Sequence, residues 1–499
     1  MVSEGIEMAG MTARDVQEAG IAPMTPGERL RSEVLRTVES LRARGLDDEL
    51  VLQALFPRTI LPPEVMETLT SALISGGHVI LFGPPGSGKT SLAKDVWALF
   101  PKKVLVVEDC PVQDDPLSLV DPSYSRAVPP CPFCKTKYAG ISYTDLREFR
   151  AGDVEPSKVP VREGFLREGH GFARLQGSSE VFPDNLTGTI NLHKLEELGD
   201  PTSPLVLEPG KLLQANRGLL IVDEVGKLPV GTQNVLLQAL QESTVSPAKS
   251  RETFPAAFVA ICTSNLTDLD NINEPLSDRL QNVYVGFNRE HHKNRAIIDI
   301  ALAQKPLSAM FPDVLIEAGV YLIEEWRRGT GEIYELSEVG SNRTMIDIAL
   351  RSEAYAAMGG ARSPLVGMDD FKKGALDAML GHIRARGGDS YAQDEKTVQE
   401  FLKKQFGEAM HKAGLEYWCT FFAGTLKRDR SEAKRILEEC RMVVKAPAPE
   451  KSRSPKFARF AEYAASREKL RGRPGGPDVA VTAFSLLQEM DVFECAEEK

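Results

Sequence analysis

Eight consecutive residues have the types and the spacing of a loop that binds nucleotide phosphates. They fit the pattern G-x-x-x-x-G-K-[ST] and are Gly83, Pro84, Pro85, Gly86, Ser87, Gly88, Lys89 and Thr90, with Ser91 directly after them. Glycines let successive backbone N–H groups converge on phosphates, and the start of a helix adds a favourable partial charge. The Lys89 ammonium would reach the β- and γ-phosphates, and the Thr90 hydroxyl would bind Mg²⁺. We therefore expect ATP and Mg²⁺ to bind at this loop.

Two carboxylates end an apolar run further along the chain. The run 219–222 is followed by Asp223 and Glu224. Asp223 would hold Mg²⁺, directly or through water, and Glu224 would polarise the attacking water. On its own, such a pair is equally compatible with a strand whose last polar residues meet solvent. The upstream phosphate loop favours the catalytic interpretation, and the second acid predicts hydrolysis rather than binding alone.

Three further residues follow in an order that suits the same reaction. Asn265, in ICTSNL, ends an apolar run and is placed to orient the lytic water. Arg279, in PLSDRL, would act as a finger on the γ-phosphate of a neighbouring subunit. Arg343, in GSNRT, opens a later helix and would report the γ-phosphate to that region. A surface arginine usually pairs with a carboxylate or is solvated, so only their order along the chain supports these roles.

A cysteine cluster predicts a second site. Cys131 and Cys134 form a C-x₂-C pair that suits two ligands of one tetrahedral zinc ion, and Cys110 would be a third ligand. A fourth ligand is not evident, because His170 is only the nearest histidine in sequence. A solvent-exposed loop with spare thiols and a redox pair are the alternatives. The remaining cysteines are expected to be buried or incidental: Cys262, Cys419, Cys440 and Cys495.

The elements that would position these residues alternate between strands and helices. Five apolar runs have strand length: HVILF, KVLVVED, GLLIVDEV, AAFVAICTSN and QNVYVGF. Amphipathic segments lie between them, which indicates a parallel sheet covered by helices on both faces. The long spacing between the phosphate loop and the acidic pair requires an insertion at about 110–205, rich in Pro, Gly and charge. We expect loops and small elements on the surface there.

The rest of the chain is predicted to be helical. Residues 1–60 form a leader, expected to be weakly ordered over 1–28, and a helical extension. The α/β core occupies 61–290. The strand signal disappears from about residue 288, so a helical lid is assigned to 291–390 and a helical C-terminal extension to 391–499. In the lid, Phe371, Ala375, Met379 and Ile383 would share one helix face.

Composition narrows the classes of partner and location. The 499 residues carry a net charge of −11, which argues against nucleic acid as a general partner. No apolar run reaches the roughly 18 residues that a membrane span needs. The N-terminus shows no signal-peptide core, and seven cysteines are an odd number for a disulfide framework. We expect a cytoplasmic protein without a membrane segment.

The order of the motifs resembles that of AAA+ ATPases. Walker A would be 83–90, Walker B 219–224, sensor 1 Asn265, the arginine finger Arg279 and sensor 2 Arg343. Within that superfamily, four segments are similar to the helix-2-insert group, which includes the ATPase subunit of magnesium chelatase and MoxR-type proteins. These segments are DNLTGTINLHKLEELG (184–199), LEPGKLLQANRGLLIVDEVGKLP (207–229), PLSDRL and GSNRT. The resemblance covers about 70–385.

This resemblance implies an architecture and a task. It implies a P-loop sheet of five parallel strands in the order 5-1-4-3-2, a helical lid, and a ring, expected to be hexameric, with ATP between subunits. It also implies a chaperone-like role on a client protein, often one with a von Willebrand factor A domain. The task would be metal insertion or maturation of a cofactor-bearing complex.

Two other classes of function remain open. Some bacterial serine protein kinases carry an AAA-like module, although this chain contains neither an HRD nor a DFG motif. A nucleic-acid remodelling ATPase is the other alternative, and the acidic net charge weighs against it.

Overall fold

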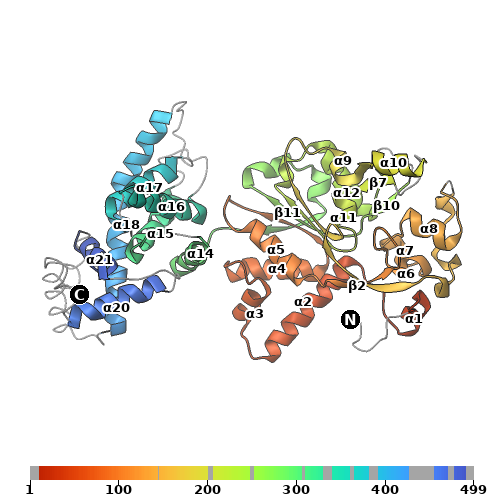
Figure 1. Cartoon of the computed structure of the whole chain (residues 1–499), viewed down its shortest axis with the longest axis horizontal. Coiled ribbons are helices and arrows are strands. Elements are labelled where there is room, and N and C mark those ends of the chain that lie inside the picture. The colour runs from red at the N-terminus through yellow and green to blue at the C-terminus, as the bar shows by residue number, and fades with distance from the viewer. Residues whose placement is uncertain are drawn as a thin grey trace. The chain divides into compact units, whose positions relative to one another are not determined.

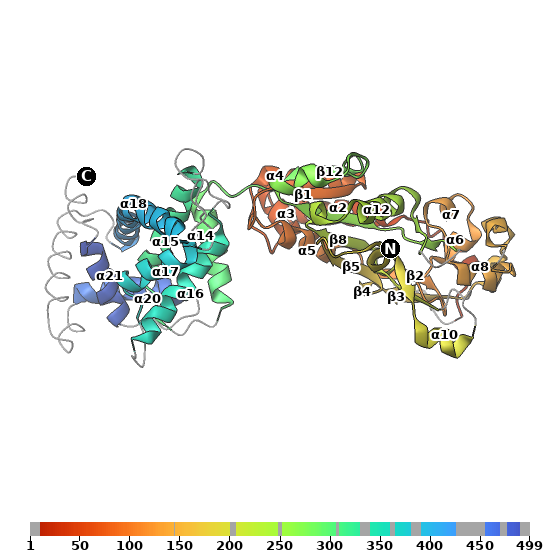
Figure 2. The same cartoon turned by 90° about the horizontal axis from the view of Figure 1, so that it is seen from above.

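The strand before the phosphate loop lies inside a six-stranded parallel sheet in the computed structural model (Figures 1 and 2). In spatial order the strands are β12 (Leu280–Tyr284), β1 (His78–Phe82), β11 (Val259–Ser264), β8 (Leu219–Asp223), β5 (Gly171–Gln176) and β4 (Arg167–Glu168). Val79, Ile80 and Leu81 of β1 are all buried, as a central strand covered on both faces requires. The predicted P-loop α/β fold is confirmed.

The structure describes most of the chain. The described residues are 10–143, 145–199, 206–247, 252–305, 309–329, 340–359, 365–380, 391–425, 455–469 and 477–489. Two compact units are distinguished, one formed by Met1–Pro84 with Gly88–Gly286 and the other by Pro85–Ser87 with Phe287–Lys499. Among the described residues, no helix has both the length and the apolar character needed to cross a membrane.

Helices cover both faces of the sheet because side chains of a strand alternate between its faces. On one face, Leu219 and Ile221 of β8 join a core built with α2 (Pro26–Ala43), α3 (Asp48–Leu55), α4 (Pro63–Ser75) and α5 (Lys89–Leu99). On the other face, Leu220 and Val222 join a core built with α9 (Pro183–Thr187), α11 (Lys211–Gln214), α12 (Val230–Glu242) and α13 (Glu274–Ser277). The N-terminal helices α2 and α3 are thus part of the core of the α/β unit.

The second edge of the sheet differs from the expected order. The order 5-1-4-3 is confirmed, but the next strand is β5, from within the expected insertion. The KVLVVED run forms β2 (Lys103–Val107), which instead pairs antiparallel with β3 (Val161–Phe165) in a separate two-stranded sheet. β2 is apolar on both faces because it serves two cores, with Val104 and Val106 in one and Leu105 and Val107 in another. The KVLVVED run is therefore apolar because both faces of β2 are buried, and not because it belongs to the main sheet.

The expected insertion is a folded module and not a set of surface loops. It contains α6 (Pro116–Val120), α7 (Tyr124–Ala127), α8 (Pro132–Ala139) and three short 3₁₀ turns, η1 (Leu146–Glu148), η2 (Ala151–Asp153) and η3 (Pro156–Lys158). Its own core includes Met11, Ala13 and Val16, from the segment expected to be weakly ordered. That segment forms α1 (Ala13–Glu18). We call this α1–η3 group, together with β2 and β3, the insertion module.

A second small insertion interrupts the helix between β5 and β8. α9 and α11 pack against each other, and between them the chain forms β6 (Gly188–Ile190), α10 (Leu192–Leu198) and β7 (Leu207–Pro209). The arrangement fits the helix-2-insert resemblance. The remaining short elements of the unit are η5 (Val225–Lys227), β9 (Thr244–Val245), β10 (Phe254–Pro255) and η6 (Leu266–Asn271).

The second unit is helical, as the loss of strand signal predicted. Its helices are α14 (His291–Ala303), α15 (Asp313–Gly329), α16 (Asn342–Met358), α17 (Met368–Leu380), α18 (Tyr391–Thr425), α20 (Pro455–Lys469) and α21 (Pro477–Glu489). Phe371, Ala375 and Met379 are buried on one face of α17, whereas Ile383 lies outside the described residues. One aromatic-rich core joins α15 to α18, α20 and α21, so the expected lid and C-terminal extension share their packing.

Candidate active site

The phosphate loop joins β1 to α5 in a conformation that requires glycine. A Cβ atom on Gly83 would lie 2.2 Å from the carbonyl oxygen of Val285, far inside van der Waals contact. Gly88 has a φ of 99° and precedes the first residue of α5, where no side chain caps the helix. The loop backbone thus carries no side chain at these two positions and leads into the uncapped N–H groups at the start of an 11-residue helix. These features fit a phosphate group.

The side chains around this loop fit the charges of a magnesium nucleotide. The buried Lys89 ammonium donates to the carbonyl oxygens of Gly83 (2.9 Å) and Pro84 (2.7 Å), so it is folded back over the loop. On the other side, the Thr90 hydroxyl donates to Oδ1 of Asp223 over 3.0 Å. A hydroxyl and a carboxylate side by side are suitable oxygen ligands for Mg²⁺. Ser91 is exposed on the first turn of α5.

The two acids are held at the carboxyl end of β8. Asp223 is 2% exposed, and its Oδ1 also accepts from the Thr263 hydroxyl of β11 over 3.3 Å. Glu224 has a left-handed backbone with φ of 56°, and its N–H donates to the same hydroxyl over 3.0 Å. A non-glycine residue in this region is strained and is retained where its surroundings fix it. The left-handed backbone therefore breaks the strand at Glu224, directly after Asp223.

β5 contributes two residues that sequence reasoning missed. The Arg174 guanidinium pairs with Oδ2 of Asp223 at 2.5 Å and 2.6 Å. The Gln176 amide donates to Oε2 of Glu224 over 2.8 Å. The signal was present in GFARLQ, where polar residues alternate with buried Ala173 and Leu175 and end beside the acidic strand. Both acids are thus restrained from the neighbouring strand.

Gln176→Ala is expected to raise the basal rate of ATP hydrolysis up to about tenfold. A typical hydrogen bond contributes about 0.5–1.5 kcal/mol, which is up to about tenfold in rate, and Glu224, as the predicted general base, must leave this bond before it acts on water. Steady-state phosphate release measures the effect. Lys227→Ala is the control, because its ion pair with Glu224 (3.1 Å) joins two partly exposed side chains, and the loss of such a pair should change the rate much less. A drop in rate for Gln176→Ala would mean that the amide positions Glu224 for catalysis.

Asn265 and Arg279 lie at opposite ends of the parallel strands. Ser264 is the partner of Phe82, and its carbonyl oxygen accepts from the N–H of Gly83 over 3.3 Å, so Asn265 follows beside the phosphate loop. Arg279 is exposed in the turn before β12, whose first residue pairs with His78 at the amino end of β1. The four residue steps of β1 separate these ends by roughly 13 Å. Arg279 is therefore remote from the phosphate loop of its own chain and accessible to another.

Arg343 lies in the helical unit. It is the exposed second residue of α16, whose first turn is capped by the Ser341 hydroxyl accepting from the Thr344 N–H over 3.3 Å. Its role as sensor 2, like the roles of Asn265 and Arg279, stays a prediction.

The four cysteines whose side chains are described lie as the sequence suggested. Cys110, Cys131 and Cys134 lie together with Asp114, whereas His170 is exposed in a turn outside the group. Cys262 is fully buried in β11, and burial, followed by the charge of Asp223, raises the pKa of its thiol to about 12. It is therefore no nucleophile. The side chains of Cys419, Cys440 and Cys495 lie outside what the structure describes.

Comparisons with known proteins place the same region in a family. Residues 77–323 match the PrkA AAA domain, a range that contains the phosphate loop, both acids, Asn265 and Arg279. Three relatives are informative. The archaeal Lon protease of Methanothermobacter thermautotrophicus is 25% identical over 295 residues, 49% of this chain and 45% of that protein. The serine/threonine kinase YeaG of Escherichia coli K12 is 26% identical over 225 residues, 42% of this chain and 35% of that protein.

The third relative aligns over most of its length. The magnesium-chelatase subunit ChlI homolog of Methanocaldococcus jannaschii is 22% identical over 407 residues, 73% of this chain and 94% of that protein. By contrast, the chain spans less than half the length of the Lon protease and of YeaG. We conclude that residues 77–323 form an AAA+ ATPase domain and that the chain resembles the magnesium chelatase subunits.

Proposed function

We propose that the protein is a MoxR-type, chaperone-like ATPase that works as a ring, with six subunits expected, and remodels a partner protein or inserts metal into it. The observation that carries the proposal is the place of Arg279, exposed and about one strand length from its own phosphate loop. The Arg279 guanidinium that contacts a γ-phosphate at this loop would therefore come from a second copy of the chain. Each active site would then lie between two copies.

The residues of the site have separate tasks in this reaction. Lys89 and the uncapped start of α5 would bind the phosphates. Mg²⁺ held by Thr90 and Asp223 would neutralise the charge on the β- and γ-phosphate oxygens. Glu224 would accept a proton from water that Asn265 orients, and Arg279 of a neighbour would stabilise the charge of the transferring group. The products are ADP and phosphate, and their release would move the lid, with Arg343 as its reporter.

A partner surface is available on the small insertion and at the residue before α9. Phe182 is 65% exposed, and Leu192 and Leu198 of α10 are 71% and 46% exposed. Figure 2 shows α10 projecting from the α/β unit. Exposed apolar side chains of this kind favour contact with another protein. We propose a client protein there, by resemblance one with a von Willebrand factor A domain, and no membrane or nucleic-acid partner.

A protein kinase is the second candidate. It rests on the match to the PrkA AAA domain and on the similarity to YeaG, whose name describes a serine/threonine kinase. The two candidates differ in the fate of the γ-phosphate, which a kinase transfers to protein and a remodelling ATPase releases.

ATP labelled at the γ-phosphate tests the proposal. We expect free labelled phosphate to form in amounts that far exceed the protein present, with no label on the chain or on added acceptor proteins. Added DNA or RNA should not stimulate release. Label that accumulates on protein at the rate of ATP consumption would replace the proposal by the kinase, and strong stimulation by nucleic acid would replace it by a nucleic-acid remodeller.

We further propose a cytoplasmic location, supported by the described cysteines Cys110, Cys131, Cys134 and Cys262, which are thiols. Besides ATP and Mg²⁺, we propose zinc as a third cofactor, at the cysteine cluster.

A further inference from the structure

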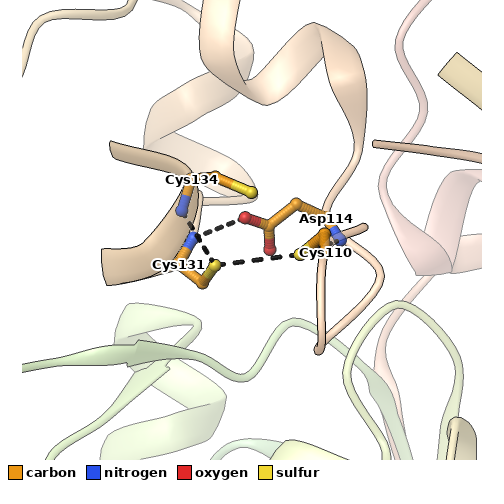
Figure 3. Close-up of side chains that lie close together, drawn as sticks. All are labelled: Cys110, Asp114, Cys131 and Cys134. Atoms are coloured by element: carbon orange, nitrogen blue, oxygen red, sulfur yellow. Dashed lines mark hydrogen bonds between the residues drawn. The ribbon is translucent and has the colours of Figure 1, made fainter. Parts of the chain in front are cut away.

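Three buried thiols and one buried carboxylate converge inside the insertion module (Figure 3). Cys110 and Asp114 come from the loop after β2, and Cys131 and Cys134 come from the start of α8. One ligand atom of each residue lies within 4.8 Å of the ligand atoms of all the others. Sequence spacing supplied three of these residues, and the fold supplies the fourth, Asp114.

The sulfur spacing suits one small ion. The Sγ atoms of Cys110 and Cys131 are 3.8 Å apart. Two thiolates at about 2.3 Å from a tetrahedral zinc ion are about 3.8 Å apart. A disulfide requires about 2.05 Å, and these cysteines are free.

One carboxylate oxygen of Asp114 accepts no hydrogen bond in the described structure. Its side chain is 2% exposed, and Oδ2 accepts from the N–H of Cys131 over 2.7 Å. Its Oδ1 is buried and has no hydrogen-bond partner in the described structure. Figure 3 shows the carboxylate between the two cysteine-bearing segments. A buried carboxylate oxygen without a donor is unfavourable, and a cation bound among the thiols would satisfy it.

The backbone is arranged to support thiolates. The N–H of Asp114 donates to Sγ of Cys110 over 3.3 Å, and the N–H of Cys134 donates to Sγ of Cys131 over 3.4 Å. Cys131 is also the N-cap of α8, where the helix favours negative charge. The loop that carries Cys110 is turned by a left-handed residue on each side, Asp109 and Gln113. Such outer contacts orient metal ligands in known sites.

We propose that Cys110, Asp114, Cys131 and Cys134 bind one structural zinc ion in a closed tetrahedral site. With four protein ligands no position is left for a substrate, so the role is structural. The ion fastens α8 to the loop after β2 and thereby completes the small core of the module, which contains all three cysteines. The site is independent of the proposed ATPase mechanism, and either proposal can fail without the other.

Zinc content of the purified full chain is the first test. We expect one zinc per chain, lost in Cys131→Ser and Cys134→Ser and kept in the matched control Cys262→Ser, whose thiol is buried in the main sheet. Asp114→Asn should weaken zinc binding at least about tenfold. The control is Asp109→Asn. Asp109 lies five residues before Asp114 and its side chain is exposed, so this variant should bind zinc normally.

The second test uses the unmodified chain, so it does not depend on the folding of variants. Removal of zinc by a chelator should increase hydrogen exchange within 105–161, while exchange in β1, β8 and β11 stays unchanged. Cobalt in place of zinc should give the strong sulfur-to-metal absorption of a thiolate site. Absence of zinc with reactive thiols, a Cys110–Cys131 disulfide, or bound iron with sulfide would each overturn the proposal.

Discussion

Arg279→Ala is expected to lower kcat for ATP hydrolysis about 10³-fold, the lower end of the range known for arginine fingers, and to leave ATP binding nearly unchanged. In the proposed mechanism the guanidinium acts on charge that develops in the transition state. Arg279 itself lies about one strand length from the phosphate loop of its own chain. Steady-state phosphate release gives kcat, and binding of a fluorescent ATP analogue gives the affinity.

The matched control for this variant is Arg44→Ala. Arg44 is an exposed arginine at the end of α2 in the same unit, and we expect its removal to change kcat by less than twofold, as for surface positions in general. If Arg279→Ala hydrolysed ATP at the normal rate, the residue would be a solvated surface arginine and the shared site would lose its support.

Glu224→Gln is expected to lower kcat by about 10²–10⁴-fold, the range for the loss of a general base. The substitution keeps the size of the side chain and the hydrogen-bonding capacity toward Gln176, but it removes the proton acceptor. ATP should remain bound and unhydrolysed, and the oligomer should persist in size-exclusion chromatography with ATP.

Glu242→Gln makes the same chemical change at an exposed position near the end of α12 and should leave turnover intact. Normal hydrolysis by Glu224→Gln would remove Glu224 from the mechanism. Loss of ATP binding in this variant would instead indicate a role in holding the nucleotide.

The phosphate loop and the acidic pair were predictable because their chemistry is local. A few neighbouring residues are enough to specify each feature. These features are the glycine that tolerates no Cβ, the lysine at the start of the helix and the two acids at the end of the strand. The central strands were predictable for a similar reason, since they are buried on both faces and read as short apolar runs.

The missed residues depend on pairing between distant segments. Gln176 reaches Glu224 only because β5 takes the place beside β8 that was expected for β2. Asp114 is one of several acids after β2, and it becomes a ligand candidate only where α8 brings Cys131 and Cys134 beside it. Burial of α1 in the insertion module depends in the same way on a partner 146 residues away, since Ala13 N–H donates to the Val159 carbonyl oxygen. The local sequence around each of these residues does not indicate which distant segment it will contact.

Mixing two inactive variants tests most directly whether two copies build each site. Arg279→Ala copies keep the loop and the acids, and Glu224→Gln copies keep the finger. In an equal random mixture, about a quarter of the sites would combine both intact parts, so we predict recovery of about a quarter of normal turnover. Differently tagged copies that purify together and yet remain as inactive as the separate variants would contradict the account.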